Sequence, residues 1–231
     1  MQQIAVRCRG IKKHYGEKEN RVDALKEIDL DIERGKLTLL VGPSGSGKTT
    51  LLSIITTILT PDAGKLYLLG TNMGKIPDTE RAEFCRKYLG IVFQSLFLIP
   101  TLTVVENIAL PLIIAGESTN YSENKAMQLL EQMHLSDRSH SSPLSLSKGQ
   151  QQRIAIARAM VNDSQILVCD EPTSALDEHS GLEIMALLRE KVLDSSRAVL
   201  VVTHDQRTFP FADRIIYMND GKIVLESKEK G

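Results

Sequence analysis

The sequence has few cysteines and no excess of charge of either sign. Its three cysteines, Cys8, Cys85 and Cys169, are odd in number, widely spaced and free of any CxxC pair. This pattern predicts reduced thiols in a cytosolic protein, because secreted disulfide frameworks use paired cysteines. Lysine and arginine number 28 against 29 aspartate and glutamate. Because the charges are so evenly balanced, the protein has no overall electrostatic field that would attract nucleic acid or anionic lipid. We therefore expect no nucleic-acid partner.

Long apolar runs are also missing. The longest, residues 108–115, is interrupted by Pro111 and is far shorter than the roughly 20 residues that span a bilayer. The first ten residues, MQQIAVRCRG, lack the apolar segment of a signal peptide. A length of 231 residues favours one domain whose core needs neither disulfides nor metals. We therefore expect any work at a membrane to occur through a partner.

The chain does contain strand-like segments that alternate with helix-like ones. Continuous apolar runs predict strands buried on both faces, and apolar spacings of three and four predict helices. Strands are expected at residues 4–9, 24–32, 37–41, 65–69, 89–93, 166–169, 199–202, 215–218 and 222–225. Helices are expected from residue 48 to before 61, within 103–134 and over 150–160. A further helical stripe, expected to pack in the core, consists of Leu182, Met185, Leu188 and Val192. Residues 219–221, Asn-Asp-Gly, predict a hairpin turn, and residues 226–231 a frayed tail. This alternation predicts an α/β fold with a mostly parallel sheet covered on both faces.

A glycine-rich segment follows the expected strand at residues 37–41. It matches the phosphate-binding pattern G-x-x-x-x-G-K-[ST] and consists of Gly42, Pro43, Ser44, Gly45, Ser46, Gly47, Lys48, Thr49 and Thr50. Glycines let the backbone curl so that successive N–H groups face phosphate oxygens, and the following helix presents its positive end. Lys48 is expected to reach the β- and γ-phosphates of ATP, and the Thr49 hydroxyl to bind Mg²⁺.

Two carboxylates end the apolar strand ILVCDE. Asp170 is placed to hold Mg²⁺ through a water, as a Walker B aspartate does. Glu171 is expected to point elsewhere, because successive strand side chains alternate, and to act as general base toward the attacking water. Cys169 beside them is expected to be a small core hydrophobe. Acidic residues at a strand end are common, so these two indicate a nucleotide site only because the phosphate-binding loop is also present.

The segment LSKGQQQRIAIARAM distinguishes one class of P-loop protein from the others. With the preceding motifs it resembles the ATP-binding subunit of an ABC transporter, and the resemblance runs from Tyr15 to Gly221. In that family the segment reads LSGGQ and completes the ATP site of a second copy lying head to tail. The resemblance implies that Ser147 and Gly149 donate to the γ-phosphate across the interface and that Gln150 lines it. Lys148 departs from the family pattern, and Ser147 also suits a helix N-cap.

Four further roles depend on the resemblance alone. It implies that Gln94 contacts Mg²⁺ and the attacking water, that His204 holds the γ-phosphate and Glu171, and that Asp177 communicates between the two sites. It implies that Tyr15 stacks on adenine. Each residue has an ordinary alternative: a surface glutamine, a structural histidine, an N-cap aspartate or a strand tyrosine.

The same resemblance implies an architecture and a set of partners. The expected fold is a RecA-like P-loop NTPase core with an antiparallel β subdomain, about residues 1–93 and 161–231, and an inserted α-helical subdomain, about 94–160. Expected partners are a second copy and integral membrane permease subunits at the cytoplasmic face of the inner membrane, with periplasmic or outer-membrane components reached through the permease.

The segments VFQ, PTLTVVEN and LSKGQQQRIAIARAM most resemble the lipoprotein-release and macrolide-exporter branch. That branch implies export or extraction of an envelope substrate. The cell-division ATPase of the same branch, which signals across the membrane, and the iron–sulfur assembly ATPase stay as alternatives. A small-molecule P-loop kinase would not explain LSKGQ.

Overall fold

A computed structural model describes residues 4–227. Its larger sheet has six strands in the order β10-β9-β3-β8-β7-β6. These strands are β3 (Leu37–Val41), β6 (Leu89–Val92), β7 (Ile166–Asp170), β8 (Ala198–Val202), β9 (Arg214–Asn219) and β10 (Lys222–Ser227). All neighbours pair in parallel except β9 and β10, which form the expected hairpin. The predicted α/β fold with a mostly parallel sheet is confirmed.

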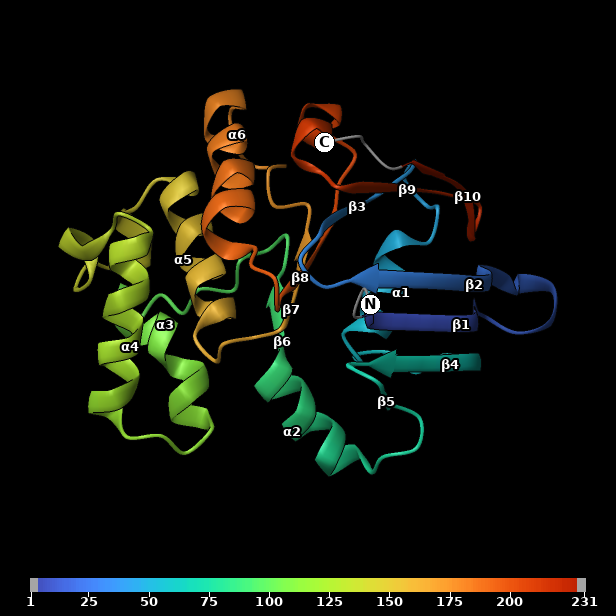
Figure 1. The fold of residues 1–231 in the computed structure, drawn as a ribbon, viewed down its shortest axis with the longest axis horizontal. Coiled ribbons are helices and arrows are strands. Elements are labelled where there is room, and N and C mark those ends of the chain that lie inside the picture. Colours follow the sequence, from blue (N-terminus) through green and yellow to red (C-terminus); the bar gives the residue numbers. More distant parts are fainter. Residues whose placement is uncertain (1–3, 228–231) are drawn as a thin grey trace.

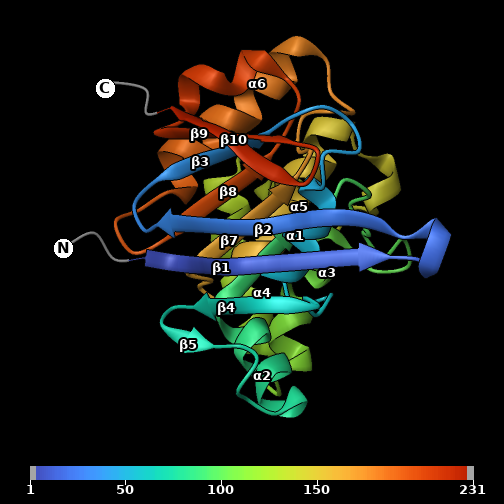
Figure 2. The ribbon, with the colours of Figure 1, turned by 90° about the vertical axis from the view of Figure 1, so that its right-hand side faces the viewer.

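The smaller sheet has four antiparallel strands in the order β2-β1-β4-β5. They are β1 (Ile4–Tyr15), β2 (Val22–Glu33), β4 (Ala63–Leu68) and β5 (Thr71–Asn72). Figure 2 shows these strands side by side in that order. The first two are longer than the sequence indicated, because β-bulges let them continue through irregular stretches of the pattern.

The helices form two groups. They are α1 (Lys48–Ile55), α2 (Asp78–Tyr88), α3 (Val104–Ile114), α4 (Thr119–Gln132), α5 (Lys148–Met160) and α6 (Glu178–Leu187). Helices α3, α4 and α5 lie together at one end of the molecule, and the four-stranded sheet lies at the other (Figure 1). Helix α1 packs between the two sheets, since its apolar side chains share one core with both. The proposed subdomain limits at residues 94 and 160 stay a prediction.

The central strands bury both faces. On β3, Leu37 and Leu39 face the core that contains α3 to α6, while Leu40 faces the core that contains α1. On β8, Val201 faces the core that contains α3 to α6, and Leu200 faces the core that contains α1. Continuous apolar runs are therefore required here, because alternate side chains enter different cores.

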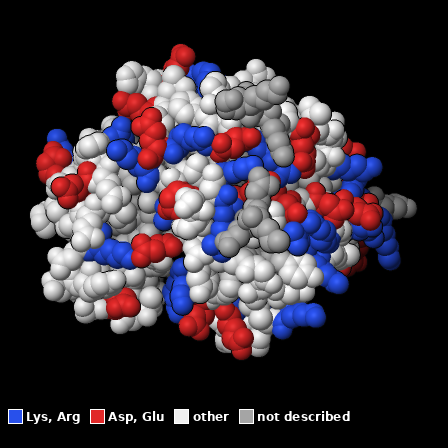
Figure 3. All heavy atoms as spheres, in the orientation of Figure 1, with Lys and Arg blue, Asp and Glu red and all other residues white. Residues whose placement is uncertain are grey.

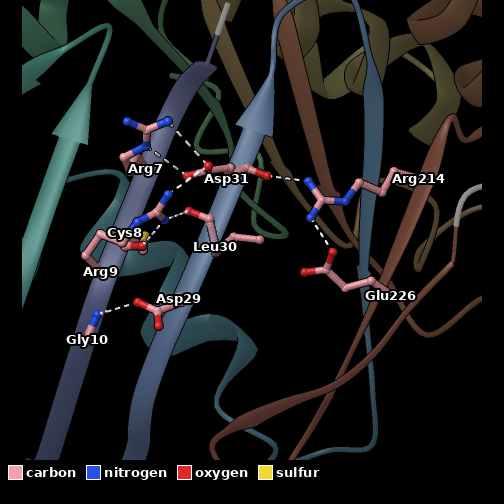
Figure 4. A network of polar contacts seen from close by, with 9 residues as sticks. All are labelled: Arg7, Cys8, Arg9, Gly10, Asp29, Leu30, Asp31, Arg214 and Glu226. Carbon is pink, nitrogen blue, oxygen red and sulfur yellow. Dashed lines mark hydrogen bonds and ion pairs between the residues drawn. The ribbon is translucent and has the colours of Figure 1, made fainter. Parts of the chain in front are cut away.

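A polar network joins the two sheets at one edge (Figure 4). The Asp31 carboxylate of β2 pairs with Arg9 at 2.8 Å and with Arg7 at 3.2 Å, both from β1. The Asp31 carbonyl accepts from Arg214 of β9, which also pairs with Glu226 of β10. One residue of β2 thus connects strands of both sheets. Elsewhere on the face shown in Figure 3, acidic and basic side chains are interspersed.

Three expectations need correction. Helix α2 was not expected, and none of its residues is buried, so it has no apolar stripe to read. Leu182 is 37% exposed and does not belong to the core stripe, whereas Met185, Leu188 and Val192 are buried. After α6 the chain forms a π-helical turn over Leu188–Val192, which rotates the buried face. The expected frayed tail is wrong for Glu226 and Ser227, which belong to β10, and its remainder, residues 228–231, lies outside the described residues. Among residues 4–227 no helix has the length and apolarity to cross a membrane.

Candidate functional site

The glycine-rich loop leaves β3 and enters α1, which is the context that phosphate binding requires. Gly47 precedes α1 with φ 98°, and a Cβ there would lie 2.5 Å from the Ala24 carbonyl oxygen. At Gly42 a Cβ would lie 2.1 Å from the Met218 carbonyl oxygen. Only glycine fits at these two positions, because the backbone of β2 lies against Gly47 and the backbone of β9 lies against Gly42.

Lys48 is buried beneath this loop. Its ammonium donates to the carbonyls of Gly42 at 2.8 Å and Pro43 at 2.9 Å. Burial lowers the pKa of Lys48, and the nearby carboxylates of Glu171 and Asp170 oppose that shift. The ammonium is therefore held at the loop, next to the N-terminal end of α1, where anionic phosphates are favoured.

A cavity of about 660 Å³ opens over the loop. It is lined by Val22, Asp23, Ala24, the nine residues Gly42 to Thr50, Gln94, Asp170, Glu171, Val202, His204, Asp220 and Gly221. The structure thus brings together the phosphate loop, both expected carboxylates, the expected glutamine and the expected histidine. Sequence reasoning missed Asp23, Ala24 and Asp220 as lining residues. For Asp220 the sequence did contain a signal, the Asn-Asp-Gly turn, and the Gly221 N–H of that turn donates to the Ser46 carbonyl of the loop at 3.0 Å.

Asp170 and Glu171 both line this cavity, which corrects one expectation. Side-chain alternation would have sent Glu171 away from Asp170, but Glu171 follows the last residue of β7 and has φ 50°. This left-handed backbone ends the alternation. Its N–H still donates to the Val202 carbonyl of β8 at 2.9 Å, so the strained residue is held in place. Burial and the neighbouring Glu171 raise the pKa of Asp170, and Lys48 opposes that shift.

Glu171 also contacts the expected histidine. Nδ1 of His204 lies 2.8 Å from Oε1 of Glu171, and Oε2 of Glu171 is buried without a hydrogen-bond partner among the described residues. His204 itself remains mostly exposed at the cavity. A carboxylate oriented by a ring nitrogen beside a phosphate site can accept a proton from a water molecule.

The donor set at this cavity suits Mg²⁺. Thr49, Gln94 and Asp170 present a hydroxyl, an amide and a carboxylate, all hard oxygen donors. Among the described residues no group of three or more His, Cys, Asp and Glu side chains could hold a metal alone. Mg²⁺ is commonly held by one or two carboxylates together with substrate phosphates, and Asp170 supplies one carboxylate here.

Five predicted site residues stand outside this cavity. They are Tyr15, Ser147, Gly149, Gln150 and Asp177. Tyr15 ends β1, and its backbone pairs in register with Val22, which does line the cavity. Asp177 caps α6: its carboxylate accepts from the Ser180 N–H at 3.0 Å. The N-cap alternative is correct for Asp177, and the expected communication between sites stays a prediction.

Ser147 begins α5 with a capping box. Its hydroxyl accepts from the Gln150 N–H at 3.2 Å, and the Gln150 side chain accepts from the Ser147 N–H at 3.0 Å. The N-cap alternative is therefore correct here as well. Ser147 is exposed and Gly149 and Gln150 are partly exposed, and none of the three lines the cavity over the phosphate loop of its own chain.

Comparison with known proteins gives a consistent result. A family model described as ABC transporter matches residues 25–174. An ABC transporter ATP-binding protein of Methanocaldococcus jannaschii is 41% identical, covering 95% of this chain and 97% of its own length. A macrolide export ATP-binding/permease protein of Aggregatibacter actinomycetemcomitans is 38% identical over 97% of this chain. A pyoverdine export ATP-binding/permease protein of Pseudomonas fluorescens is 41% identical over 98%. The chain spans about a third, 35%, of the length of these two export relatives.

Solved structures agree with the sequence relatives. An ATP-binding cassette solved as a dimer in a post-hydrolysis state with ADP and phosphate superposes with a TM-score of 0.88 at 38% identity, covering 98% of this chain and 99% of that one. The expected macrolide-exporter branch is confirmed by the relatives, and the P-loop fold by the structures. The chain belongs to the ABC transporter family, as an ATP-binding cassette that hydrolyses ATP.

Proposed function

We propose that this cassette is the motor of an export or extraction machine and that two copies close head to tail around ATP. The observation that carries the proposal is that the motif residues lie at two separate places on one chain. Lys48, Asp170 and Glu171 line one cavity, while Ser147 and Gly149 lie at the start of α5, outside that cavity. A second copy would supply these two donors, and the related cassette was solved as a dimer.

The proposed reaction follows from the positions of the side chains. Lys48 and the loop N–H groups bind the β- and γ-phosphates, and Tyr15 stacks on the adenine. Thr49, Gln94 and Asp170 would hold Mg²⁺, which supplies charge neutralisation at the phosphates when bound. Glu171 accepts a proton from the attacking water, and His204 contacts the γ-phosphate while holding Glu171. Ser147 and Gly149 of the facing copy donate to the γ-phosphate, so closure completes the site.

The movement of the two cassettes as they close would be transmitted to membrane subunits through the surface beside Gln94. Phe97 and Leu144, which are 67% and 74% exposed, line a groove next to the carboxylate end of the cavity. Large exposed apolar side chains around a groove suit a protein partner. We propose a permease segment there, which would hold the cassette at the cytoplasmic face of the inner membrane. Periplasmic or outer-membrane components would be reached through that permease.

Mixing two inactive variants tests the head-to-tail site. In a dimer of a Ser147→Ala chain and a Glu171→Gln chain, one site would keep both Glu171 and Ser147, and the other would lose both. We expect each variant alone to hydrolyse ATP very slowly, and an exchanged equal mixture to recover about a quarter of wild-type turnover, because half the dimers are mixed and each has one complete site. A mixture no faster than the variants alone would contradict the proposal.

Co-purification tests the transport role. Extraction in detergent with a tagged cassette is expected to recover a membrane subunit, whereas recovery of a soluble scaffold protein would support the iron–sulfur assembly alternative. A substrate assay in vesicles would then separate export or extraction from signalling.

A further inference from the structure

Gln152 has a buried side-chain nitrogen without a hydrogen-bond partner in the described part of the chain. It lies on α5, is 5% exposed, and its Nε2 makes no hydrogen bond to any residue within 4–227. An unpaired buried amide costs on the order of 1–3 kcal/mol, so such a group needs a reason. Its neighbour Gln151, by contrast, donates to the carbonyls of Pro143 and Leu146.

A second unpaired atom belongs to Glu171. Oε1 of this residue contacts His204 at 2.8 Å, whereas Oε2 is buried and has no partner in the described part of the chain. A carboxylate oxygen accepts hydrogen bonds, and an amide nitrogen donates them. The two unpaired atoms are therefore complementary.

Both side chains line the same cavity, which is the groove that Phe97 and Leu144 also line and which no residue of the phosphate loop lines. It has a volume of about 360 Å³ and lies between the segment after Gln94, the start of α5 and the chain from Glu171 to Leu176. Ser174 also lines it, and its hydroxyl donates to the Glu171 carbonyl at 3.0 Å. A water occupies about 30 Å³ and needs two to four polar partners, so this cavity offers enough space and enough partners for one.

We propose that Gln152 is a positioning residue for Glu171, holding its Oε2 through a water molecule in this cavity. His204 holds Oε1, so the two contacts fix the carboxylate plane against rotation. A base oriented at both oxygens keeps its remaining lone pairs aimed at the attacking water, and misplacement by about 1 Å can cost about 100-fold in rate. The inference rests on the proposed role of Glu171 as general base.

Two substitutions at Gln152 test this role. Gln152→Met keeps the length of the side chain and removes its hydrogen bonds, and Gln152→Glu keeps the shape but places a second negative charge near Glu171. We expect Gln152→Met to lower kcat about 10- to 100-fold, with the Kd for ATP and the unfolding temperature within error of wild type. We expect Gln152→Glu to lower kcat further, because like charges repel.

Thr38→Val is the matched control. Oγ1 of Thr38 is also buried and unpaired among the described residues, but Thr38 lies on β3 and does not line the cavity. We expect this variant to keep wild-type kcat. A purely structural role for Gln152 would lower the unfolding temperature and ATP binding together with kcat, and that result would overturn the proposal.

Wild-type kcat in Gln152→Met would also overturn the proposal. Glu171→Gln, measured in parallel, separates this failure from failure of the proposed function. If Glu171→Gln is inactive while Gln152→Met is normal, only the role of Gln152 is wrong. If Glu171→Gln itself keeps wild-type turnover, Glu171 is not the base and both proposals fail.

Discussion

Nδ1 of His204 and Oε1 of Glu171 lie 2.8 Å apart, although 32 residues separate them along the chain. The contact exists because β7 and β8 are parallel neighbours, which places their carboxyl ends at the same edge of the sheet. When the Glu171 carboxylate is ionised it only accepts, so Nδ1 of His204 then donates to it and Nε2 is left out of this contact. The pair therefore offers one group for water and one for phosphate.

Replacement of Glu171 by glutamine is expected to separate binding from hydrolysis. Glutamine keeps the size of the side chain but cannot take the proton, and loss of a general base costs about 10²- to 10⁴-fold in turnover. Lys48 and the loop are untouched, so ATP should still bind and trap a closed dimer. Size-exclusion chromatography with ATP and a phosphate-release assay check both parts. Wild-type turnover would remove Glu171 from the base role.

Lys148 is expected to be compatible with an active site. It is the first residue of α5 and lines the groove beside Gln94, while Ser147 and Gly149 keep the family pattern. We expect Lys148→Gly to change turnover by less than about tenfold and to lower the free energy of unfolding by at most about 1 kcal/mol, the usual cost of glycine in a helix. Lys148→Ala separates loss of charge from loss of backbone restriction. A hundredfold gain in turnover would show that Lys148 strongly impairs ATP hydrolysis in the native site.

Asn107 is expected to be a major contributor to stability. It is fully buried on α3, and its side chain donates to the carbonyls of Ile99, Leu102 and Thr103 and accepts from the Ile99 N–H at 2.7 Å. Asn107→Ala leaves these groups unpaired, so we expect a loss of about 3 kcal/mol in the free energy of unfolding, measured in urea.

Asn124→Ala on α4 is the control for that measurement, because within residues 4–227 the Asn124 side chain makes a single hydrogen bond, to Asn120 at 3.4 Å on the exposed surface. We expect a change within about 0.5 kcal/mol there. Equal effects of the two substitutions would show that the hydrogen bonds of Asn107 contribute little.

Asp62 is expected to make stability depend on pH in the acid range. Its carboxylate accepts from Lys13 at 2.8 Å and from the His14 N–H at 2.7 Å, and these contacts lower its pKa. The contribution is present above the unfolded pKa, about 3.9, and is lost as pH falls through the lower folded value. The difference in unfolding free energy between wild type and Asp62→Asn should therefore shrink between pH 7 and pH 3. A constant difference would contradict this.

Local patterns in the sequence were sufficient for several elements. The strand at Leu37–Val41 ends where expected, and the Asn-Asp-Gly turn joins β9 to β10, because turn chemistry and continuous apolar runs act over a few residues. Helix α2 was missed because it buries no side chain, and Leu182 was misplaced because the π-helical turn after α6 changes the buried face. The π-helical turn buries Leu188 and Val192 in a core built from distant segments, which no local pattern records.

The phosphate loop, the order of the motifs and the alternation of strands and helices were determined by the sequence alone, since each depends on neighbouring residues. Only the tertiary structure decided that Glu171 lines the same cavity as Asp170, that His204 contacts Glu171, and that Gln152 and Glu171 both line the groove beside Gln94. These relationships join β7, β8 and α5, and their spacing is set by the sheet register and by core packing, which no short stretch of sequence contains.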